Sequence, residues 1–261
     1  MSAEAFTPDQ AVIETLEFST DAGLGQKARI GLIVLQTDQT IEHEFRQMLP
    51  SDEVALYHSR IPNAMEVTPQ TLRQMQLDLP TAAGLLPTSF GFDAVGYACT
   101  SGATMIGEAR VDQMIRDLHP TARTSNPITA CKAALFALGL RRIALVTPYA
   151  PDVTLEMQAN LQQAGFQTTA VATFNDSDDF TVARITTESI RKAITTIGAR
   201  AEVDGVFVSC TSLRSLGVIA EAEAQIGKPV IASNQVLAWH LARLAGLKDA
   251  KPSFGRLFAA H

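Results

Sequence analysis

The sequence lacks the motifs that mark several common kinds of functional site. Its three cysteines include no C-x-x-C pair, and its five histidines show no metal-ligand spacing, so no metal site is expected. There is no Walker A motif and no G-x-S-x-G motif, which argues against a P-loop nucleotide hydrolase and an α/β-hydrolase. The segment "GLGQ" (23–26) precedes an apolar run instead of following one, so a dinucleotide-binding fingerprint is not supported.

Positive charge and long apolar runs are also scarce. The 261 residues include 21 basic and 27 acidic side chains, for a formal net charge of −6, which argues against a nucleic-acid partner. No run approaches the ~20 apolar residues that span a bilayer. The segment "MSAEAFTPDQAVIETLEF" lacks the charged-then-apolar pattern of an export signal, and the cysteine count is odd. We therefore expect a cytoplasmic protein with reduced thiols and no membrane partner.

Apolar runs of strand length alternate with helix-like segments, a pattern that predicts an α/β fold with parallel sheets. Residues 1–28 are expected to form an arm or a leading helix, and Pro80 is expected to interrupt a helix. The expected strands are 29–35, 53–61, 92–99, 141–149, 167–174, 203–210 and 228–234. The expected helices are 40–48, 68–86, 102–118, 126–140, 154–166, 186–200, 215–227 and 235–247.

One motif occurs twice. "FDAVGYACTSG" and "VDGVFVSCTSL" share an aspartate, a valine and the tripeptide Cys-Thr-Ser, which begins at Cys99 and again at Cys210, 111 residues later. "RIGLIV" (29–34) and "RIALVT" (142–147) repeat at nearly the same offset. This duplication predicts two pseudo-symmetric lobes, each a parallel sheet flanked by helices, with the active site between them. We expect residues 1–122 plus 231–261 to form the N-terminal lobe and 123–230 the C-terminal lobe.

The position of the two cysteines indicates chemistry. Ligands of open parallel sheets bind beyond the carboxyl ends of the strands, where Cys99 and Cys210 are both expected. A thiol at a helix N-terminus is biased toward thiolate, and the Thr-Ser amides and hydroxyls that follow can hold an anionic oxygen. Two facing lobes would then present two sulfur atoms to opposite sides of one substrate.

Three functions fit such a pair. One thiolate could remove a proton next to a carboxylate while the opposite thiol returns one, which is racemisation. Alternatively, a thiolate could add to an activated double bond and allow rotation before elimination. A two-lobed protein that only binds a small molecule is the third possibility. Cys131 lies within helix-like sequence and is expected in the core.

Several segments resemble the maleate isomerase and arylmalonate decarboxylase branch of the aspartate/glutamate racemase superfamily. They are "ACTSGAT" (98–104), "LVTPY" (145–149), "VFVSCTSL" (206–213), "ASNQVLAWH" (232–240) and "SFGRLF" (253–258). The resemblance implies two Rossmann-like lobes, catalysis without a cofactor, and a homo-oligomer acting on a small carboxylate or amino-acid derivative. It implies that Cys99 and Cys210 are the catalytic pair. The residues it implies for substrate binding are Thr100, Ser101, Tyr149, Thr211 and Asn234.

The sequence departs from that branch at two places. Asp38 stands where maleate isomerases have an asparagine, and Asp179, in "DDFTVAR" (178–184), corresponds to a second asparagine. An ionised aspartate accepts hydrogen bonds but repels a carboxylate, so the two exchanges favour a substrate with an ammonium or amide group. Either aspartate could instead be a solvated loop residue or a helix cap.

The stretch "GLIVLQTDQTIEHEF" (31–45) resembles most the ectoine-utilisation members of the branch. Decarboxylases of the branch keep only the second cysteine, so the presence of Cys99 favours an isomerase or racemase. The leading prediction is a two-cysteine isomerase that inverts the α-carbon of a diaminobutyrate derivative during ectoine catabolism. The alternatives are a maleate cis–trans isomerase and a non-catalytic binding protein.

Overall fold

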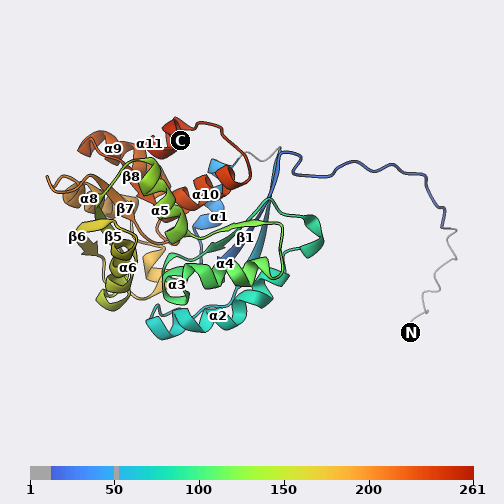
Figure 1. Ribbon diagram of the computed structural model, residues 1–261, viewed down its shortest axis with the longest axis horizontal. Coiled ribbons are helices and arrows are strands. Elements are labelled where there is room, and N and C mark those ends of the chain that lie inside the picture. Colours follow the sequence, from blue (N-terminus) through green and yellow to red (C-terminus); the bar gives the residue numbers. More distant parts are fainter. Residues whose placement is uncertain (1–12, 50–52) are drawn as a thin grey trace, which may run out of the picture.

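The computed structural model describes residues 13–49 and 53–261, and these contain two four-stranded parallel sheets (Figure 1). The first sheet has the order β2-β1-β3-β4 and the second the order β6-β5-β7-β8. The strands of the first sheet are β1 Ala28–Leu35, β2 Val54–Ile61, β3 Ala94–Ala98 and β4 Arg123–Ser125. Those of the second are β5 Arg142–Thr147, β6 Gln167–Thr173, β7 Gly205–Val208 and β8 Val230–Ala232.

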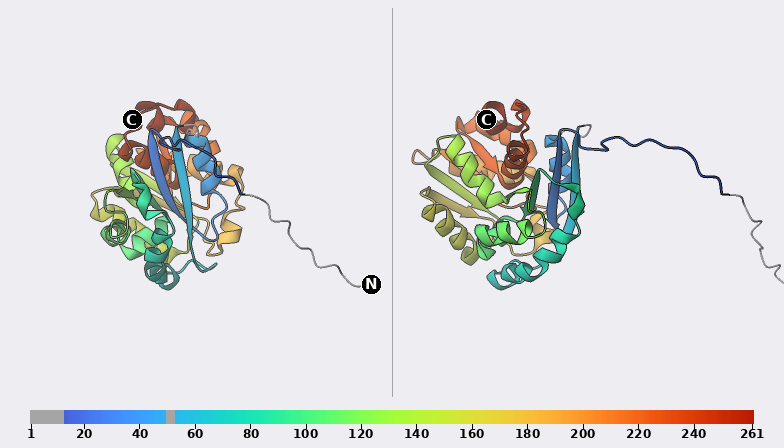
Figure 2. Two further views of the ribbon diagram at one scale, coloured as in Figure 1. Left: turned by 90° about the vertical axis from the view of Figure 1, so that its right-hand side faces the viewer. Right: turned by 45° about the vertical axis from the view of Figure 1, so that its right-hand side comes forward.

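Helices cover both sheets, which lie on opposite sides of the molecule in Figure 2. The α-helices are α1 Ile41–Met48, α2 Pro69–Gly84, α3 Thr100–Ile106, α4 Glu108–Arg116, α5 Pro127–Ala137, α6 Pro151–Gln163, α7 Asp179–Val182, α8 Thr187–Gly198, α9 Ile219–Ile226, α10 Ser233–Leu244 and α11 Arg256–Ala260. Short 3₁₀ turns are η1 Thr88–Phe90, η2 Leu216–Val218 and η3 Pro252–Phe254. No helix within the described ranges is long and apolar enough to cross a membrane.

The central strands explain why the fold was predictable from the sequence. All residues of β3 and β7 are buried, and β1 and β5 each have only one residue that is not. Strands covered on both faces need continuous apolar runs instead of alternation. Each sheet places its second strand at one edge, followed by its first, third and fourth strands. The predicted fold of two similar α/β lobes is therefore confirmed.

Local details differ from the predictions. The expected helix 102–118 is two helices, because Gly107 adopts φ 96°, a left-handed conformation that ends α3. Helix α2 continues through Pro80 instead of stopping there. The prediction of a leading helix is wrong for residues 13–27, which form an arm that leaves the body (Figure 1), and residues 1–12 lie outside the described part.

The lobe boundaries near residues 122 and 231 stay predictions. Strand β4, just after the first boundary, pairs with β3 of the first sheet. Strand β8, at the second boundary, pairs with β7 of the second sheet. Helix α10 packs against α5, α1 and β3, so it joins the two sheets into one body.

Candidate active site

Cys99 follows β3 directly and caps the N-terminus of α3. Its sulfur atom accepts a hydrogen bond from the backbone N–H of Gly102 at 3.2 Å, and the Ser101 hydroxyl lies 3.7 Å from it. The thiol is 2% exposed. A Cβ atom at Gly102 would lie 2.5 Å from the Tyr97 hydroxyl and 2.9 Å from Cys99 Sγ, so the tight turn under the sulfur requires glycine.

Cys210 follows β7 after one intervening residue and is 4% exposed. Its sulfur atom accepts a hydrogen bond from the backbone N–H of Ser212 at 3.3 Å. The next regular element is the 3₁₀ turn η2, which begins at Leu216, so no helix starts at Cys210. The prediction of a helix N-terminus beside each cysteine is therefore correct for Cys99 and wrong for Cys210.

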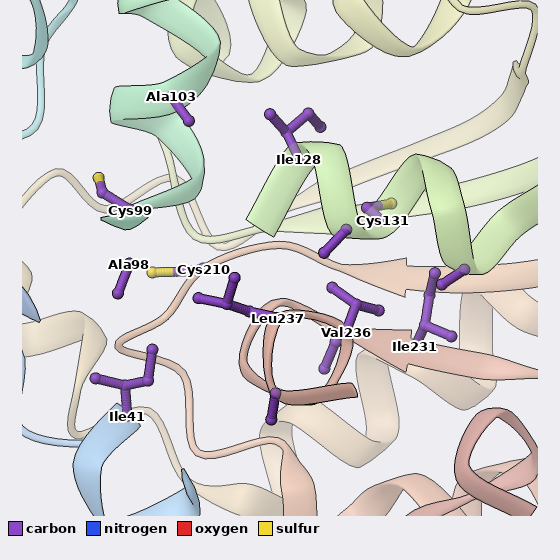
Figure 3. Packing of buried hydrophobic residues seen from close by; sticks show 14 of the residues in the cluster. Ile41, Ala98, Cys99, Ala103, Ile128, Cys131, Cys210, Ile231, Val236 and Leu237 are labelled. Atoms are coloured by element: carbon purple, nitrogen blue, oxygen red, sulfur yellow. The ribbon is translucent and has the colours of Figure 1, made fainter. Parts of the chain in front are cut away.

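Both thiols line one small pocket, with a cavity volume of about 20 Å³. Figure 3 shows Cys99 at the start of α3 and Cys210 on the loop after β7, while Cys131 lies farther away on α5. The predicted site residues that line the pocket are Cys99, Ser101, Tyr149, Asp179, Cys210 and Thr211. They come from both sheets, so the pocket lies between the lobes as the duplication predicted.

Tyr149 follows β5, is buried, and lines the pocket together with Cys210 and Ser101. Burial raises the pKa of Tyr149 well above its ordinary value, and ionised Cys210 or Cys99 would raise it further. The phenol therefore keeps its proton and can donate it in a hydrogen bond to a sulfur atom or a substrate oxygen.

The surroundings of the thiols disfavour their charged forms. Burial raises the pKa of Cys99 to about 12, against the opposing effects of the Gly102 amide and the Ser101 hydroxyl. Burial also raises the pKa of Cys210 to about 12, and the Asp179 carboxylate adds to that rise. Both thiols are consequently protonated at neutral pH in the protein without a ligand.

Asp179 is the first residue of α7 and lines the pocket. Its Oδ2 accepts hydrogen bonds from the Thr37 hydroxyl at 2.6 Å and from Asn63 Nδ2 at 3.3 Å. The backbone of Asp179 donates to the carbonyl of Met65 at 3.1 Å. A carboxylate of the second lobe is thus held in place by residues of the first, and burial raises its pKa.

Asp38 does not line the pocket, although it lies close behind it. Its Oδ1 accepts hydrogen bonds from the amides of Thr40 and Ile41, both at 2.8 Å, so Asp38 caps the start of α1. Burial raises the pKa of Asp38 to about 6, and the side chain of Thr211 offsets part of that rise. Asp38 therefore serves the start of α1 and does not contact the pocket, and its Oδ2 is buried without a hydrogen-bond partner among the described residues.

Two further predicted binding residues also lie behind the wall. Thr100 Oγ1 is 2.8 Å from Ser233 Oγ, which in turn accepts a hydrogen bond from the Cys210 amide at 3.0 Å. Asn234 Nδ2 donates to Glu44 Oε2 and to the carbonyl oxygen of Thr211, both at 2.8 Å. Thr100 and Asn234 do not line the pocket, and their side chains support the cysteine loops; a contact of either with substrate stays a prediction.

The structure adds residues that the sequence patterns did not indicate. Asn63 holds Asp179, Glu44 holds Asn234, and Ser233 links the two cysteine motifs. Ser233 lies in the segment 232–240 that resembles the family, but neither Asn63 nor Glu44 lies in a recognisable motif, so no local signal marked these two. The remaining residues that line the pocket are Leu35, Ala64, Glu66, Val67, Thr71, Leu72, Met75 and Ser212.

The charged residues that line the pocket, among those described, are all acidic. Its lining includes the acidic residues Glu66 and Asp179 and no lysine, arginine or histidine among the residues described. Across residues 13–49 and 53–261, no three histidine, cysteine or acidic side chains are grouped as a metal ion would require. A bound substrate would meet thiols, hydroxyls and carboxylates together with apolar side chains.

A sequence model of the family described as arylmalonate decarboxylase matches residues 30–258, almost the whole chain. The chain belongs to the arylmalonate decarboxylase family. It is 34% identical to the arylmalonate decarboxylase of Bordetella bronchiseptica over 132 residues, half of this chain and 55% of that enzyme. It is 26% identical to the maleate isomerase of Pseudomonas putida over 90% of this chain and 98% of that enzyme.

Solved structures of the family share the fold. The maleate cis–trans isomerase of Nocardia farcinica, in a cysteine-to-serine mutant with a covalently bound succinylcysteine intermediate, superimposes with a TM-score of 0.82. The two are 25% identical, and the superposition covers 90% of this chain and 99% of the Nocardia chain. These relatives support the predictions of an enzyme and of an isomerase in the racemase-like superfamily. A role in ectoine catabolism and a racemase reaction stay predictions.

Proposed function

We propose that this protein isomerises a small carboxylate at the carbon next to the carboxyl group, with Cys99 and Cys210 acting from two sides. One observation carries the proposal: the ends of β3 and β7, from two different sheets, place two thiols on the wall of one pocket. A pocket that served only to bind would have no need of two such groups.

The two thiols differ in what surrounds them, which assigns their roles. The Gly102 amide and the Ser101 hydroxyl stabilise negative charge on Cys99, so Cys99 is the thiolate that acts first. Cys210 also has partners that favour its thiolate, the Tyr149 hydroxyl and the Ser212 amide, but the Asp179 and Asp38 carboxylates both oppose its ionisation, so we assign it the proton. It is therefore the acid in the forward direction.

For an α-amino acid, the reaction is a proton exchange. The Cys99 thiolate removes the α-proton from one face, and the Cys210 thiol gives its proton to the other face of the carbanion. The product has the opposite configuration, Cys99 is protonated and Cys210 is the thiolate, so the same pair runs the reverse reaction from the other enantiomer. Ser101, Tyr149 and Thr211 line the pocket and would hold the carboxylate oxygens.

The finer proposal concerns the substrate. The Asp179 carboxylate and the absence of a cationic side chain among the described residues of the lining favour a substrate with an ammonium or amide group. A diaminobutyrate derivative of ectoine breakdown has this chemistry. Asp38 would add to the negative potential from behind Thr211.

Maleate cis–trans isomerisation is the second candidate. The covalent cysteine intermediate of the Nocardia enzyme favours it. The Cys99 thiolate would form a C–S bond to one alkene carbon, the remaining C–C single bond would rotate, and elimination of the thiolate would restore the double bond as fumarate. In this case Asp179 would face a dicarboxylate.

The deciding experiment incubates the enzyme in deuterium oxide with D- and L-diaminobutyrate derivatives and, separately, with maleate. Inversion with deuterium at the α-carbon supports the racemase, and formation of fumarate supports the second candidate. Cys99→Ser and Cys210→Ser should abolish either reaction. If neither substrate reacts and both variants still bind a diaminobutyrate derivative as tightly as the natural protein does, the chain is a binding protein and the proposal is wrong.

A further inference from the structure

The two oxygen atoms of the Asp179 carboxylate differ in their hydrogen bonds. Among the described residues, both side-chain hydrogen bonds that it accepts end on Oδ2, from Thr37 and Asn63. Oδ1 accepts no hydrogen bond from these residues and is not one of the fully buried polar atoms. Asp179 also lines the pocket. The clamp on Oδ2 therefore fixes the orientation of the carboxylate and leaves Oδ1 available to a ligand.

The same pocket contains both thiols, so a thiolate would form close to an existing negative charge. The titratable groups around the thiols are the phenols Tyr97 and Tyr149 and the carboxyl groups Asp38, Asp179, Glu66 and, behind them, Glu44. None of these groups is cationic. In the part of the chain that the structure describes, no protein charge at the pocket wall can compensate a thiolate.

We propose that a cationic group of the substrate, bound at Asp179 Oδ1, supplies the missing positive charge and so switches on the thiol pair. The inference rests on the proposed function and adds a condition to it: the ammonium group is required for activation as well as for recognition.

A cation at Asp179 would change the charge state of the thiols in two ways. Asp179 repels a thiolate, and it raises the pKa of both Cys99 and Cys210 in addition to the larger effect of burial. A cation placed on Asp179 neutralises that repulsion and attracts the thiolate, with little solvent to screen either effect because Asp179 and both cysteines are buried. The empty pocket consequently keeps its sulfur atoms as thiols, the form that resists oxidation and alkylation.

The test uses methylammonium chloride as the cation and iodoacetamide, a neutral reagent, as the thiol probe. Labelling of Cys99 and Cys210 is followed separately by peptide mass spectrometry at mildly alkaline pH, with sodium chloride at equal ionic strength as the reference. Only the thiolate reacts, so methylammonium should accelerate labelling of at least one of the two by about tenfold, the equivalent of one pKa unit. Cys131, buried in α5, should not respond.

Asp179→Asn separates this role from general effects of salt. Asparagine can still accept the bonds from Thr37 and Asn63 through its oxygen, so the clamp is retained while the charge is lost. The variant should label faster than the natural protein without methylammonium and should no longer respond to it. Asp178→Asn, the same charge change at the half-buried N-cap of α7, should keep the natural response.

A second measurement needs no variant. Aminoethyl methanethiosulfonate is cationic and sulfonatoethyl methanethiosulfonate is anionic, and the pocket should react at least about tenfold faster with the cationic reagent. Equal rates, or equal acceleration by methylammonium and sodium, would overturn the inference. If isomerisation occurs while labelling ignores methylammonium, the activation step is wrong and the proposed function stands. If methylammonium accelerates labelling and no substrate is isomerised, the proposed function is wrong and the activation step stands.

Discussion

The two Cys-Thr-Ser motifs have the same sequence and different structures. The first caps α3, and Gly102 supplies the amide that bonds its sulfur atom. The second has Leu213 in the corresponding position and continues as an irregular loop until η2. Each follows the third strand of its sheet, so the fold is duplicated while the local support of the sulfur atoms is not.

The second motif is supported by residues far away in the chain. The Thr40 hydroxyl donates to the carbonyl oxygen of Ser212 at 2.8 Å, and Asn234 donates to that of Thr211 at the same distance. Ser233 accepts the amide hydrogen bond of Cys210. One cysteine is thus positioned by its own helix and the other by tertiary contacts, which accounts for a division of roles within a repeated motif.

The largest effects are expected from removing either thiol. Cys99→Ser and Cys210→Ser should each lower kcat for isomerisation by about 10²–10⁴-fold. Cys210→Ser should still exchange the α-proton of one enantiomer with deuterium oxide, because Cys99 remains as the base. Proton NMR of each enantiomer checks this, and exchange of both enantiomers by either variant would contradict the assigned roles.

The helical support of the first motif is tested by Gly102→Ala. Its Cβ would meet the Tyr97 hydroxyl at 2.5 Å and Cys99 Sγ at 2.9 Å, which we expect to cost about 1–3 kcal/mol of unfolding free energy and to displace the sulfur. Gly217→Ala, near the second motif, has no atom within 4 Å of the added Cβ and is the matched control. Urea denaturation and kcat measure both, and similar losses in the two variants would contradict the prediction.

The tertiary support of the second motif is tested by Asn234→Ala. The change removes the hydrogen bonds from Asn234 to the buried Glu44 carboxyl and to the Thr211 carbonyl, at an expected cost of about 1–3 kcal/mol. The labelling rate of Cys210 should change more than that of Cys99. Equal changes at the two cysteines would show that the motifs do not depend on separate supports.

The buried carboxyl group of Glu44 should make the free energy of unfolding depend on pH. Burial raises the pKa of Glu44 from 4.5 to about 7, so the folded state holds this proton more tightly than the unfolded chain does. Its contribution to stability is then complete below pH 4.5 and is lost as the pH rises to about 7, by about 1.4 kcal/mol for each unit of pKa shift.

The variant Glu44→Gln, which does not titrate, should flatten this fall in unfolding free energy, whatever constant offset the amide introduces. Urea denaturation at a series of pH values measures the slope. Glu156→Gln, on the exposed face of α6, should leave the slope as it is. A slope that survives in Glu44→Gln would assign the fall to another group, with Asp38 the next candidate because burial raises its pKa to about 6.

The smallest effect is expected at the third cysteine. Cys131 is fully buried in α5, outside both motifs. Cys131→Ala should lower the unfolding free energy by about 1 kcal/mol and leave kcat and the labelling of Cys99 and Cys210 unchanged. Loss of activity without loss of stability would show a role for this thiol that the structure does not indicate.

Helices and strands could be predicted from the sequence where their apolar pattern is long and uninterrupted. Long buried strands such as β1 and β5 were found, because a continuous apolar run of six to eight residues between turn signals is typical of a strand covered on both faces. Strand β4 was missed, since it has three residues and an exposed arginine at its start. The break between α3 and α4 was also missed, because Gly107 lies in a sequence that is otherwise typical of one helix.

For the site, the repeated tripeptide predicted that Cys99 and Cys210 belong to it, and the departure from the family sequence predicted the same for Asp179. Burial and pairing could not be predicted in the same way. The bond between Thr37 and Asp179 joins residues 142 positions apart, and that between Glu44 and Asn234 joins residues 190 apart. Nothing in either local sequence indicates the partner.

The features that depend on residue type and strand order follow from the sequence alone. These are the two cysteines of the repeated motif, the two similar sheets and the excess of acidic over basic residues. Which acid enters the pocket was decided only by folding, since Asp179 lines it while Asp38 caps α1 behind it. The physical reason is that a thiol's charge state follows from burial and from charges a few ångströms away. Those neighbours are set by contacts between lobes, and sequence distance does not measure them.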